Sequence, residues 1–441
     1  MEKRLAQHHP AIVKAGSWIA SGIRSLDRTG SLPYVAPILI PTGTADNADQ
    51  RKSQETANIK QVRSSSEVIG AIAQARPGDV IEMAPGIYRF HGSPISVARP
   101  GMQNDRIILR AKQPGTVILE HEMVEGFLVS APYWTFENLT IRGICSSQNG
   151  CEHAFHVVGG GSHFIARNNT ITNFNAHFKI NGINGIMPDY GLIEANILRN
   201  TVIRNTASAV TPVDLVAASG WVIRRNFISD FIKTGGNKVS FGAFAKGGGS
   251  GNRFERNIII CENLLKGVVG HRVGLSLGGG GTGAQFCRDR RCITEQERGV
   301  IEANLIASCS DEGIYLNRSA SSTIRHNTVI NTAGITVRFP ESSANVEGNI
   351  VDASIRSRED GIVRNTDNLE DSPLKSYIGV TPVRDVYQSN GEFAWRRDPP
   401  RRDAVLHTPL DLCGRQRPTG PAYGAFERFS DCLGNQNVEA R

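Results

Sequence analysis

Lys246 is the side chain whose surroundings in the sequence best suit chemistry, and it lies in the segment VSFGAFAKGGGSGN. It follows an apolar run typical of a buried strand and precedes three glycines. Because glycine has no side chain, a bulky ligand can approach the backbone there and the amine stays uncrowded. A lysine desolvated under a ligand, or placed beside another cation, can act as a base in its neutral form.

Other polar residues share the phase of Lys246 within a repeated pattern. Counting back eleven or twelve residues from the repeated asparagine reaches Asp214, Lys246 and Arg338 in three copies, and in a fourth it reaches Leu316, with Asn317 and Arg318 beside it. If the repeats stack, these residues form one strip at the ends of strands, in which Arg338 could hold a carboxylate. The strip is predicted to contain Asp214, Lys246, Asn317, Arg318 and Arg338.

A histidine and an arginine open the next apolar segment, HRVGLSL. His271 is suited to proton transfer near neutral pH, although a histidine at the start of a strand is more often structural. Arg272 is a second candidate to hold a carboxylate. Asp311 and Glu312 precede GIYLN, where they could serve as an acid, as metal ligands or as a turn cap. Two further residues would extend this surface toward the N-terminus: His177 and Asp189.

An asparagine flanked by apolar residues recurs along the chain, as in LIEANIL, VIRRNFI and TIRHNTV. The copies lie at Asn138, Asn169, Asn196, Asn226, Asn257, Asn304, Asn327 and Asn349. Their spacing suits one coil of a solenoid, and the flanking apolar residues give a strand pattern around a turn. Identical amides stacked coil on coil can hydrogen-bond side chain to side chain. The sequence therefore predicts an all-β solenoid with a long strand face lined by side chains.

Composition narrows the choice of partners. The net charge of +7 favours an anionic partner such as an acidic polysaccharide, an anionic lipid or a nucleic acid. Nucleic-acid binding predicts basic stripes interleaved with aromatic residues, and the sequence shows no such stripes. No stretch is long and apolar enough to span a membrane. We expect an acidic polysaccharide as substrate, no nucleic acid, no membrane span and a monomeric protein.

The eight cysteines fall into four groups that predict disulfides. Two pairs flank short loops, one pair lies in the tail, and one pair occupies nearly the same phase of consecutive coils. The predicted pairs are Cys145–Cys151, Cys287–Cys292, Cys261–Cys309 and Cys413–Cys432. Because disulfides persist in oxidising compartments, we expect a secreted or periplasmic protein; free buried thiols are the alternative.

The chain divides into three regions. Residues 1–60 are interpreted as a leader or a disordered extension, residues 61–355 as the solenoid, and residues 356–441 as C-terminal coils and a cap segment. A short helix over residues 65–75 would cover the open end of the stack, whose edge groups are otherwise unpaired. The tail, rich in proline and arginine, would form an irregular C-terminal cap or a strap along the outside.

Three features together resemble a known superfamily: the helix followed by PGDVIEMAPGIY, the asparagine coils, and the closing DLCGRQRPTGPAYGAFE. They are similar to right-handed parallel β-helix proteins of the pectate-lyase-like superfamily, nearest to the chondroitinase B and alginate lyase group. The resemblance covers residues 60–430 and implies a polysaccharide lyase that cleaves a uronic-acid polymer by β-elimination. In that group a lysine just past such a strand removes the proton at C5 of the sugar, and VSFGAFAK followed by GNRFERN matches Lys246 to it. The resemblance thus implies Lys246 as base, with His271 as alternative acid or base and Arg338 as a catalytic cation.

The substrate-binding residues expected around this base are Arg272, Arg318, Asn317 and Asp214. The group's calcium-binding acids lie five and seven residues before the lysine, where this chain has Phe241 and Val239. Its catalytic arginine would fall within GLSLGGGG, which has none. No cofactor is therefore expected, and calcium and the identity of any metal stay open.

Three other functions compete with the lyase. A glycoside hydrolase needs two carboxyl groups at a defined separation, and the strip supplies only Asp214. A C5-epimerase shares the proton abstraction. A non-catalytic glycan-binding solenoid would expose aromatic platforms, yet aromatic residues make up only 7% of the chain.

Overall fold

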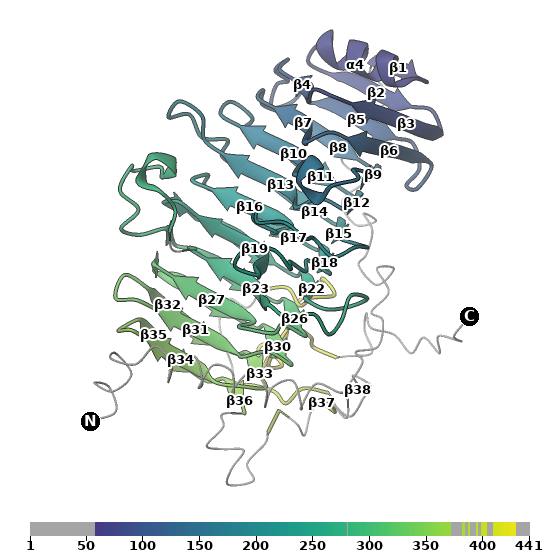
Figure 1. Cartoon of the computed structure of the whole chain (residues 1–441). Coiled ribbons are helices and arrows are strands. Elements are labelled where there is room, and N and C mark those ends of the chain that lie inside the picture. Colours follow the sequence, from purple (N-terminus) through teal and green to yellow (C-terminus); the bar gives the residue numbers. More distant parts are fainter. Residues whose placement is uncertain are drawn as a thin grey trace.

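Parallel strands make up most of the regular structure in the computed structural model, which describes residues 58–279, 281–371, 382–383, 387–388, 394–395, 398–403 and 409–428. Each complete coil contributes one strand to each of three parallel sheets, and successive coils stack one on the next (Figure 1). The predicted right-handed parallel β-helix is confirmed. Residues 1–57 of the predicted extension lie outside the described residues, and residues 58–60 already belong to the first strand.

We name the sheets A, B and C in the order in which the chain passes through them within a coil. Sheet A contains β1 (Asn58–Val62), β2 (Asp79–Met83), β5 (Ile107–Ala111), β8 (Trp134–Glu137), β11 (Ile165–Arg167), β14 (Leu192–Glu194), β17 (Val222–Arg224), β21 (Arg253–Glu255), β25 (Val300–Glu302), β29 (Ser322–Arg325), β32 (Ser343–Glu347) and β35 (Ile362–Thr366). Sheet B contains β3 (Gly86–His91), β6 (Val117–Glu122), β9 (Thr140–Gly143), β12 (Thr170–Thr172), β15 (Ile197–Arg199), β18 (Phe227–Ser229), β22 (Ile258–Ile260), β26 (Leu305–Ala307), β30 (Thr328–Ile330), β33 (Ile350–Val351) and β36 (Leu369–Glu370). Sheet C contains β4 (Ile95–Val97), β7 (Glu125–Val129), β10 (His153–Val158), β13 (Ala176–Asn181), β16 (Val213–Val216), β19 (Val239–Lys246), β23 (His271–Leu277), β27 (Ile314–Asn317), β31 (Ile335–Arg338) and β34 (Ile355–Arg358). Short strands β20 (Gly249–Ser250), β24 (Gln296–Glu297) and β28 (Ser319–Ala320) form a small parallel sheet, and β37 (Tyr387–Gln388) pairs with β38 (Ala394–Trp395).

The core is a column of side chains that stack from coil to coil. Alternate residues of each strand point inward, because successive side chains of a strand face opposite sides. In sheet C, Phe127, Phe155 and Phe178 occupy equivalent positions, and their rings stack with centroids 5.2 Å apart in each step. All three side chains are fully buried. Burial of each such side chain is worth about 1.5–3 kcal/mol, so the column stabilises the whole solenoid.

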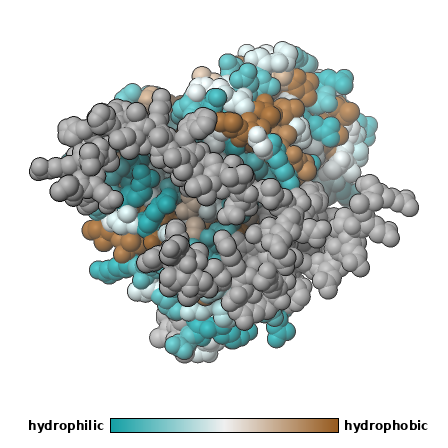
Figure 2. Space-filling model, turned by 60° about the horizontal axis from the view of Figure 1, so that its bottom comes forward, coloured by the Kyte–Doolittle hydropathy of each residue, from teal (hydrophilic) through white to brown (hydrophobic). Residues whose placement is uncertain are grey.

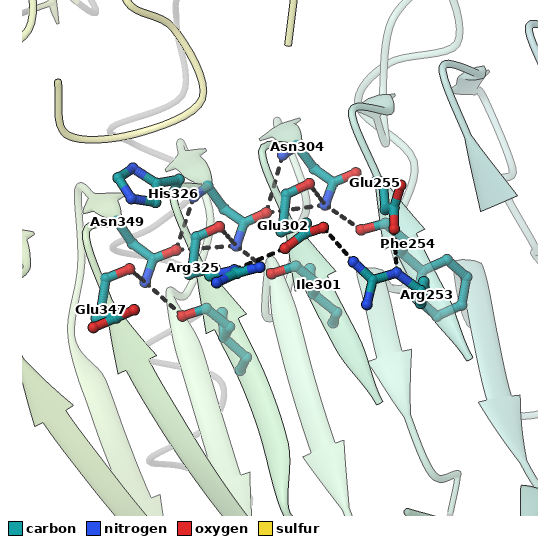
Figure 3. A network of polar contacts seen from close by, with 12 residues as sticks. Arg253, Phe254, Glu255, Ile301, Glu302, Asn304, Arg325, His326, Glu347 and Asn349 are labelled. Atoms are coloured by element: carbon teal, nitrogen blue, oxygen red, sulfur yellow. Dashed lines mark hydrogen bonds and ion pairs between the residues drawn. The ribbon is translucent and has the colours of Figure 1, made fainter. Parts of the chain in front are cut away.

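A continuous asparagine ladder occupies the turn between sheets A and B (Figure 3). In each step the side-chain Oδ1 accepts hydrogen bonds from the backbone N–H and the Nδ2 of the asparagine one coil earlier, as Asn226 does from Asn196. The Nδ2 group also donates to a backbone carbonyl of the preceding coil. The residue before each ladder asparagine takes a positive φ, such as 57° at Arg225, which turns the chain from one sheet into the next.

The ladder differs from the prediction at both ends. Asn138 lies one position too early: it has the positive φ of 64°, and Leu139 occupies the ladder position and donates its N–H to Asn169. Asn138 instead pairs with Asn168, which precedes the next ladder residue. At the other end Asn368, which was not among the predicted copies, accepts hydrogen bonds from Asn349.

The predicted cap helix is confirmed as α4 (Ser65–Ala73), two residues shorter than expected. Ser64 is its N-cap and accepts a hydrogen bond from the Glu67 N–H, while the Glu67 carboxylate accepts from the Arg63 N–H. Its buried face, Val68 and Ile72, packs on the first coil. The helix therefore closes the N-terminal end of the core (Figure 1).

The described part of the C-terminal tail lies along the outside of sheet B, as the strap alternative predicted. Leu412, Ala425 and Phe426 pack on outward-facing apolar residues of sheet B, including Ile258 and Ile330. This explains why β22 reads III, apolar on both faces. The rest of the surface viewed in Figure 2 mixes hydrophilic residues with separate hydrophobic patches, apart from the part that grey atoms cover.

Three of the predicted disulfides are present: Cys145–Cys151, Cys261–Cys309 and Cys287–Cys292. Cys413 is disulfide-bonded as well, but its predicted partner Cys432 lies outside the described residues. Among the described residues, none of the helices has the length and apolar character needed to cross a membrane.

Candidate functional site

Two rows of outward-facing side chains cross sheet C and contain most of the predicted strip. Row 1 consists of Asp214, Phe244, Ser276, Tyr315 and Thr336. Row 2 lies two positions further along each strand and consists of Val216, Lys246, Gly278, Asn317 and Arg338. Strands are about 4.8 Å apart, so the backbone of Lys246 lies roughly 10 Å from Asn317 and roughly 14 Å from Arg338.

Lys246 ends β19 and is half-buried on this outer face. Its ammonium lies 4.5 Å from the centre of the Phe244 ring, which favours a cation on its face. Its aliphatic stem rests on Gly279, where an added Cβ would come within 2.7 Å of the lysine Cδ. Within the described part of the chain, no carboxylate lies within ion-pair distance of this ammonium.

The sequence predicted that the glycines after Lys246 leave space for a ligand. In the structure they instead form a sharp turn. Gly247 and Gly248 take φ values of 77° and 81°, which few other residues adopt, and they turn the chain sharply after β19. Arg288 donates its N–H to the Gly247 carbonyl, and the Gly248 N–H donates to the Glu295 carbonyl. The described residues of the 278–295 segment (278–279 and 281–295) thus occupy the space beside the turn and form a wall next to Lys246.

Asn317, Tyr315 and Arg338 form a hydrogen-bonded cluster two to three strands from Lys246. The Tyr315 hydroxyl accepts from Asn317 Nδ2 at 3.3 Å and from Arg338 Nη1 at 3.1 Å. Arg338 also donates to Glu359 at 2.7 Å, and these partners together raise its pKa against the opposing effect of burial. A guanidinium held in this way is a rigid site for a carboxylate oxygen.

Arg318 lies next to this cluster. Its guanidinium and that of Arg338 both lie over the Phe339 ring, 5.6 and 4.4 Å from its centre. Phe339 takes a φ of 73°, an uncommon conformation for a bulky residue, which places its ring beside both arginines. The structure therefore brings Arg318, Asn317 and Arg338 together, as the strip predicted.

Asp214 lies on the same face but not in the predicted position. Its register partner is Phe244, so it belongs to row 1 and lies two residues away from the row of Lys246. Its carboxylate accepts a hydrogen bond from Lys179 at 2.9 Å. The count from Asn226 was wrong because the number of residues between sheet C and the ladder varies from coil to coil.

The structure does not bring His271 and Arg272 to Lys246. They pair with Val239 and Ser240 at the opposite end of the sheet C strands, roughly 20 Å away along the strand direction. Arg272 is only 2% exposed and donates to Glu262 at 2.7 Å and to the Val268 carbonyl. His271 is exposed and contacts the Asp311 carboxylate at 3.2 Å, a hydrogen bond that raises the pKa of the imidazole.

Two other predicted residues have structural surroundings. His177 is fully buried, and burial lowers its pKa to about 3, so it does not extend the outer surface as expected. Asp189 accepts two hydrogen bonds from Arg288, both at 2.8 Å. This pair fastens the 278–295 wall to an earlier coil, and Arg288 also bonds the Ala217 carbonyl.

Glu312 is a buried acid at the edge of this face. Its carboxylate accepts from Thr336 and Arg356, each at 3.2 Å. Burial, followed by the hydrogen bond and negative charge of Asp311, raises the pKa of Glu312 to about 7. Glu312 therefore holds its proton close to neutral pH. This applies whether it serves as an acid or as a turn cap, two of the roles that the sequence left open.

A metal site is not evident in the part of the chain that the structure describes, where no group of three or more His, Cys, Asp or Glu side chains could hold an ion. Val239 and Phe241 occupy β19 at the positions where the lyase group has its calcium ligands. Neither side chain has a donor atom for calcium.

Comparison with solved structures identifies the fold. A crystal structure of pectate lyase Pel9A superposes with a TM-score of 0.55 at 13% sequence identity, covering 85% of this chain and 98% of that one. The chain has the pectate lyase fold. An alginate lyase from Paenibacillus sp. str. FPU-7 (TM-score 0.43, 14% identity, 71% of this chain and 98% of that one) and a rhamnogalacturonan lyase (TM-score 0.45, 12% identity, 72% and 88%) are also similar. The family model described as periplasmic copper-binding protein (NosD) matches residues 284–369. A search of curated protein sequences finds no match.

Within this pectate lyase fold, sequence reasoning overlooked Tyr315. The residue lies two positions before Asn317 in IYLN, so strand alternation alone places both side chains on the same face. The sequence carried this signal, but a phenol is neither a cation, an amide nor a carboxylate, the residue types that define the predicted strip. From row 1, the Tyr315 hydroxyl contacts Asn317 and Arg338 of row 2.

Proposed function

We propose that this protein is a polysaccharide lyase that cleaves an acidic, uronic-acid-containing polysaccharide by β-elimination. One observation carries the proposal: Lys246 presents an amine without a carboxylate partner among the described residues, on the face that also presents Asn317 and Arg338. No ion pair has to be broken before this amine acts on a substrate. Lys246, Arg318 and Arg338 place positive charge on this side of sheet C, which suits a polyanion.

In the proposed reaction Lys246 removes the proton at C5 of a uronic acid residue. Arg338 and Arg318 hold the carboxylate of a sugar on the chain and stabilise the negative charge that the enolate-like intermediate places on it. Asn317 contributes a further polar contact from the same row. The buried Phe244 ring lies beneath the Lys246 ammonium and supports it on this face.

The arrangement of carboxyl groups favours elimination over hydrolysis. Hydrolysis needs an acid and a second carboxylate flanking the bond that is cleaved. On this face Asp214 already accepts from Lys179, and Glu312 accepts from Thr336 and Arg356. A C5-epimerase would share the first step and differ in returning a proton to C5, so the product distinguishes the two.

We also propose a periplasmic or secreted location and a monomeric protein. Three disulfides within the described residues support export, because such bonds persist in oxidising compartments. The partial similarity to the periplasmic NosD family agrees with this location.

The test is incubation of the purified protein with a panel of acidic polysaccharides, followed by the ultraviolet absorbance of unsaturated uronates. Lys246→Ala is expected to reduce turnover about 10²–10⁴-fold, because a positioned base acts mainly in the transition state. Lys246→Arg keeps the positive charge but cannot act as a base, so it should retain glycan binding and lose turnover. Lys112→Ala, at an exposed lysine beyond β5 in sheet A, is the matched control and should leave activity unchanged.

Two results would contradict the proposal. New reducing ends without any unsaturated product would show that the protein is a hydrolase. Full activity in Lys246→Arg would show that the lysine contributes its charge alone.

A further inference from the structure

The Tyr315 hydroxyl lies on the outer face of sheet C, and its proton is not donated in a hydrogen bond within the described residues. Its hydroxyl oxygen accepts hydrogen bonds from Asn317 Nδ2 and Arg338 Nη1. A phenol oxygen accepts through its lone pairs and donates a single O–H. Both partners are donors toward it, so the Tyr315 proton points to neither of them.

Within the described residues, that proton has no acceptor, in contrast to those of Tyr88 and Tyr423. Tyr88 donates to the Ala84 carbonyl at 2.8 Å, and Tyr423 donates to the Asp367 carboxylate. Tyr315 is half-buried and faces outward from β27. A half-buried hydroxyl whose oxygen is fixed by two donors is oriented to donate to an oxygen atom that reaches this face from outside.

The position of Tyr315 relative to Lys246 suits one reaction centre. The Lys246 ammonium lies over Phe244, and Phe244 and Tyr315 are the row 1 neighbours on either side of Ser276. The strand between them, β23, presents only Ser276 and Gly278 in the two outward rows. The amine and the phenol thus approach the same small-residue strand from opposite sides.

We propose that Tyr315 is the proton donor to the leaving oxygen in the elimination, an inference that rests on the proposed lyase function. Lys246 takes the C5 proton, and the C5–H electron pair forms the C4–C5 double bond. The bond from C4 to the glycosidic oxygen breaks and its electron pair stays on that oxygen. The oxygen takes the Tyr315 proton and becomes a hydroxyl. After the products leave, Lys246 releases its proton to water and the phenolate regains one from water, so both groups return to their starting states.

Arg338 supports this role through its contact with the phenol. When Tyr315 gives up its proton, negative charge develops on the oxygen that Arg338 Nη1 contacts at 3.1 Å. A charge-assisted hydrogen bond strengthens at that moment, because the acceptor has become an anion. Glu359 holds the other side of the guanidinium at 2.7 Å, so the cation is already in place.

The experiment compares Tyr315→Phe and Lys246→Ala on two substrates. One is the polysaccharide that the wild-type protein cleaves; the other is a uronate carrying fluoride or a nitrophenoxide at C4, which leaves without being protonated. On the polysaccharide, Tyr315→Phe should lower kcat about 10²–10⁴-fold with little change in KM. On the activated substrate it should lose less than about 10-fold, while Lys246→Ala loses activity on both.

Tyr190→Phe is the matched control, because Tyr190 is 61% exposed on a turn outside sheet C, and it should match the wild type on both substrates. Equal losses of Tyr315→Phe on the two substrates would overturn the acid role, since a positioning defect does not depend on the leaving group. Unchanged activity on the polysaccharide would overturn it as well. If the wild-type protein forms no unsaturated product on either substrate, the proposed lyase function itself is wrong. This result differs from the two outcomes that would overturn only the acid role of Tyr315.

Discussion

The ladder asparagine Asn226 offers a quantitative test of how the fold is held together. Its side chain makes four hydrogen bonds in a fully buried position. Oδ1 accepts from the Asn196 N–H at 2.9 Å and from Asn196 Nδ2 at 3.0 Å. Nδ2 donates to the Ile193 carbonyl at 2.9 Å and to Asn257 Oδ1 at 3.0 Å.

Asn226→Ala removes all four bonds but changes little else. The backbone N–H of residue 226 still donates to Asn257, so that acceptor keeps a partner. Three buried groups lose theirs: the Asn196 N–H, one Nδ2 hydrogen of Asn196 and the Ile193 carbonyl. At about 1–2 kcal/mol for each orphaned group, the free energy of unfolding should fall by about 3–6 kcal/mol.

The assay is urea unfolding followed by the fluorescence of the buried Trp134 and Trp221. Asn345→Ala is the control, because Asn345 is an exposed strand residue and its substitution should change stability by less than about 0.5 kcal/mol. Hydrogen exchange of the Asn196 amide adds a local measurement, which matters because solenoids can unfold coil by coil. If Asn226→Ala shifts the transition no more than the control does, the ladder does not stabilise the fold as reasoned.

Two further predictions concern pH and the disulfides. Because the pKa of Glu312 is raised to about 7, its contribution to stability is full below the ordinary pKa of a glutamate and is lost as pH rises through about 7. Urea midpoints measured between about pH 5 and about pH 8 should therefore fall more for the wild type than for Glu312→Gln, and equal slopes would contradict the shifted pKa. Replacing both members of Cys261–Cys309 by alanine opens a loop with a sequence separation of 48 and should cost about 4 kcal/mol. The same change at Cys287–Cys292, with a separation of 5, should cost about 2 kcal/mol, and a reversed order would show that loop length does not decide the effect.

The fold was predictable because it repeats. Each ladder asparagine reports the same turn, so an error at one copy, such as Asn138, leaves the architecture unchanged. The disulfide Cys261–Cys309 followed from the same phase argument, since the two residues occupy adjacent coils. Repetition gives several independent observations of one local structure, and their agreement outweighs any single misplacement.

The site was harder to predict because it depends on what differs between coils. The register count placed Asn317 and Arg338 correctly but missed Asp214 by two residues, since loops between sheets vary in length. It could not show that Arg272 donates to Glu262, because Glu262 lies on the irregular connection between β22 and β23, whose path the repeat does not specify. The sequence allowed a strap, but its position on sheet B could not be predicted, because its contacts join residues far apart in the sequence, such as Thr328 and Ala425.

Within each coil, the residues that stabilise the fold and the residues proposed to act on a substrate lie in separate places. The ladder and the inward column satisfy the backbone and bury apolar surface, and they constrain about half of the positions in every strand. The outward positions of sheet C are free of that requirement, so Phe244, Ser276 and Tyr315 can follow one another in a single row without disturbing the core. A substitution at Tyr315 should therefore change turnover without changing the unfolding transition. A substitution at Asn226 should change the unfolding transition and leave turnover unchanged as long as the protein stays folded. Measuring both properties on both variants separates the two parts, and a Tyr315→Phe protein that is as destabilised as Asn226→Ala would contradict this division.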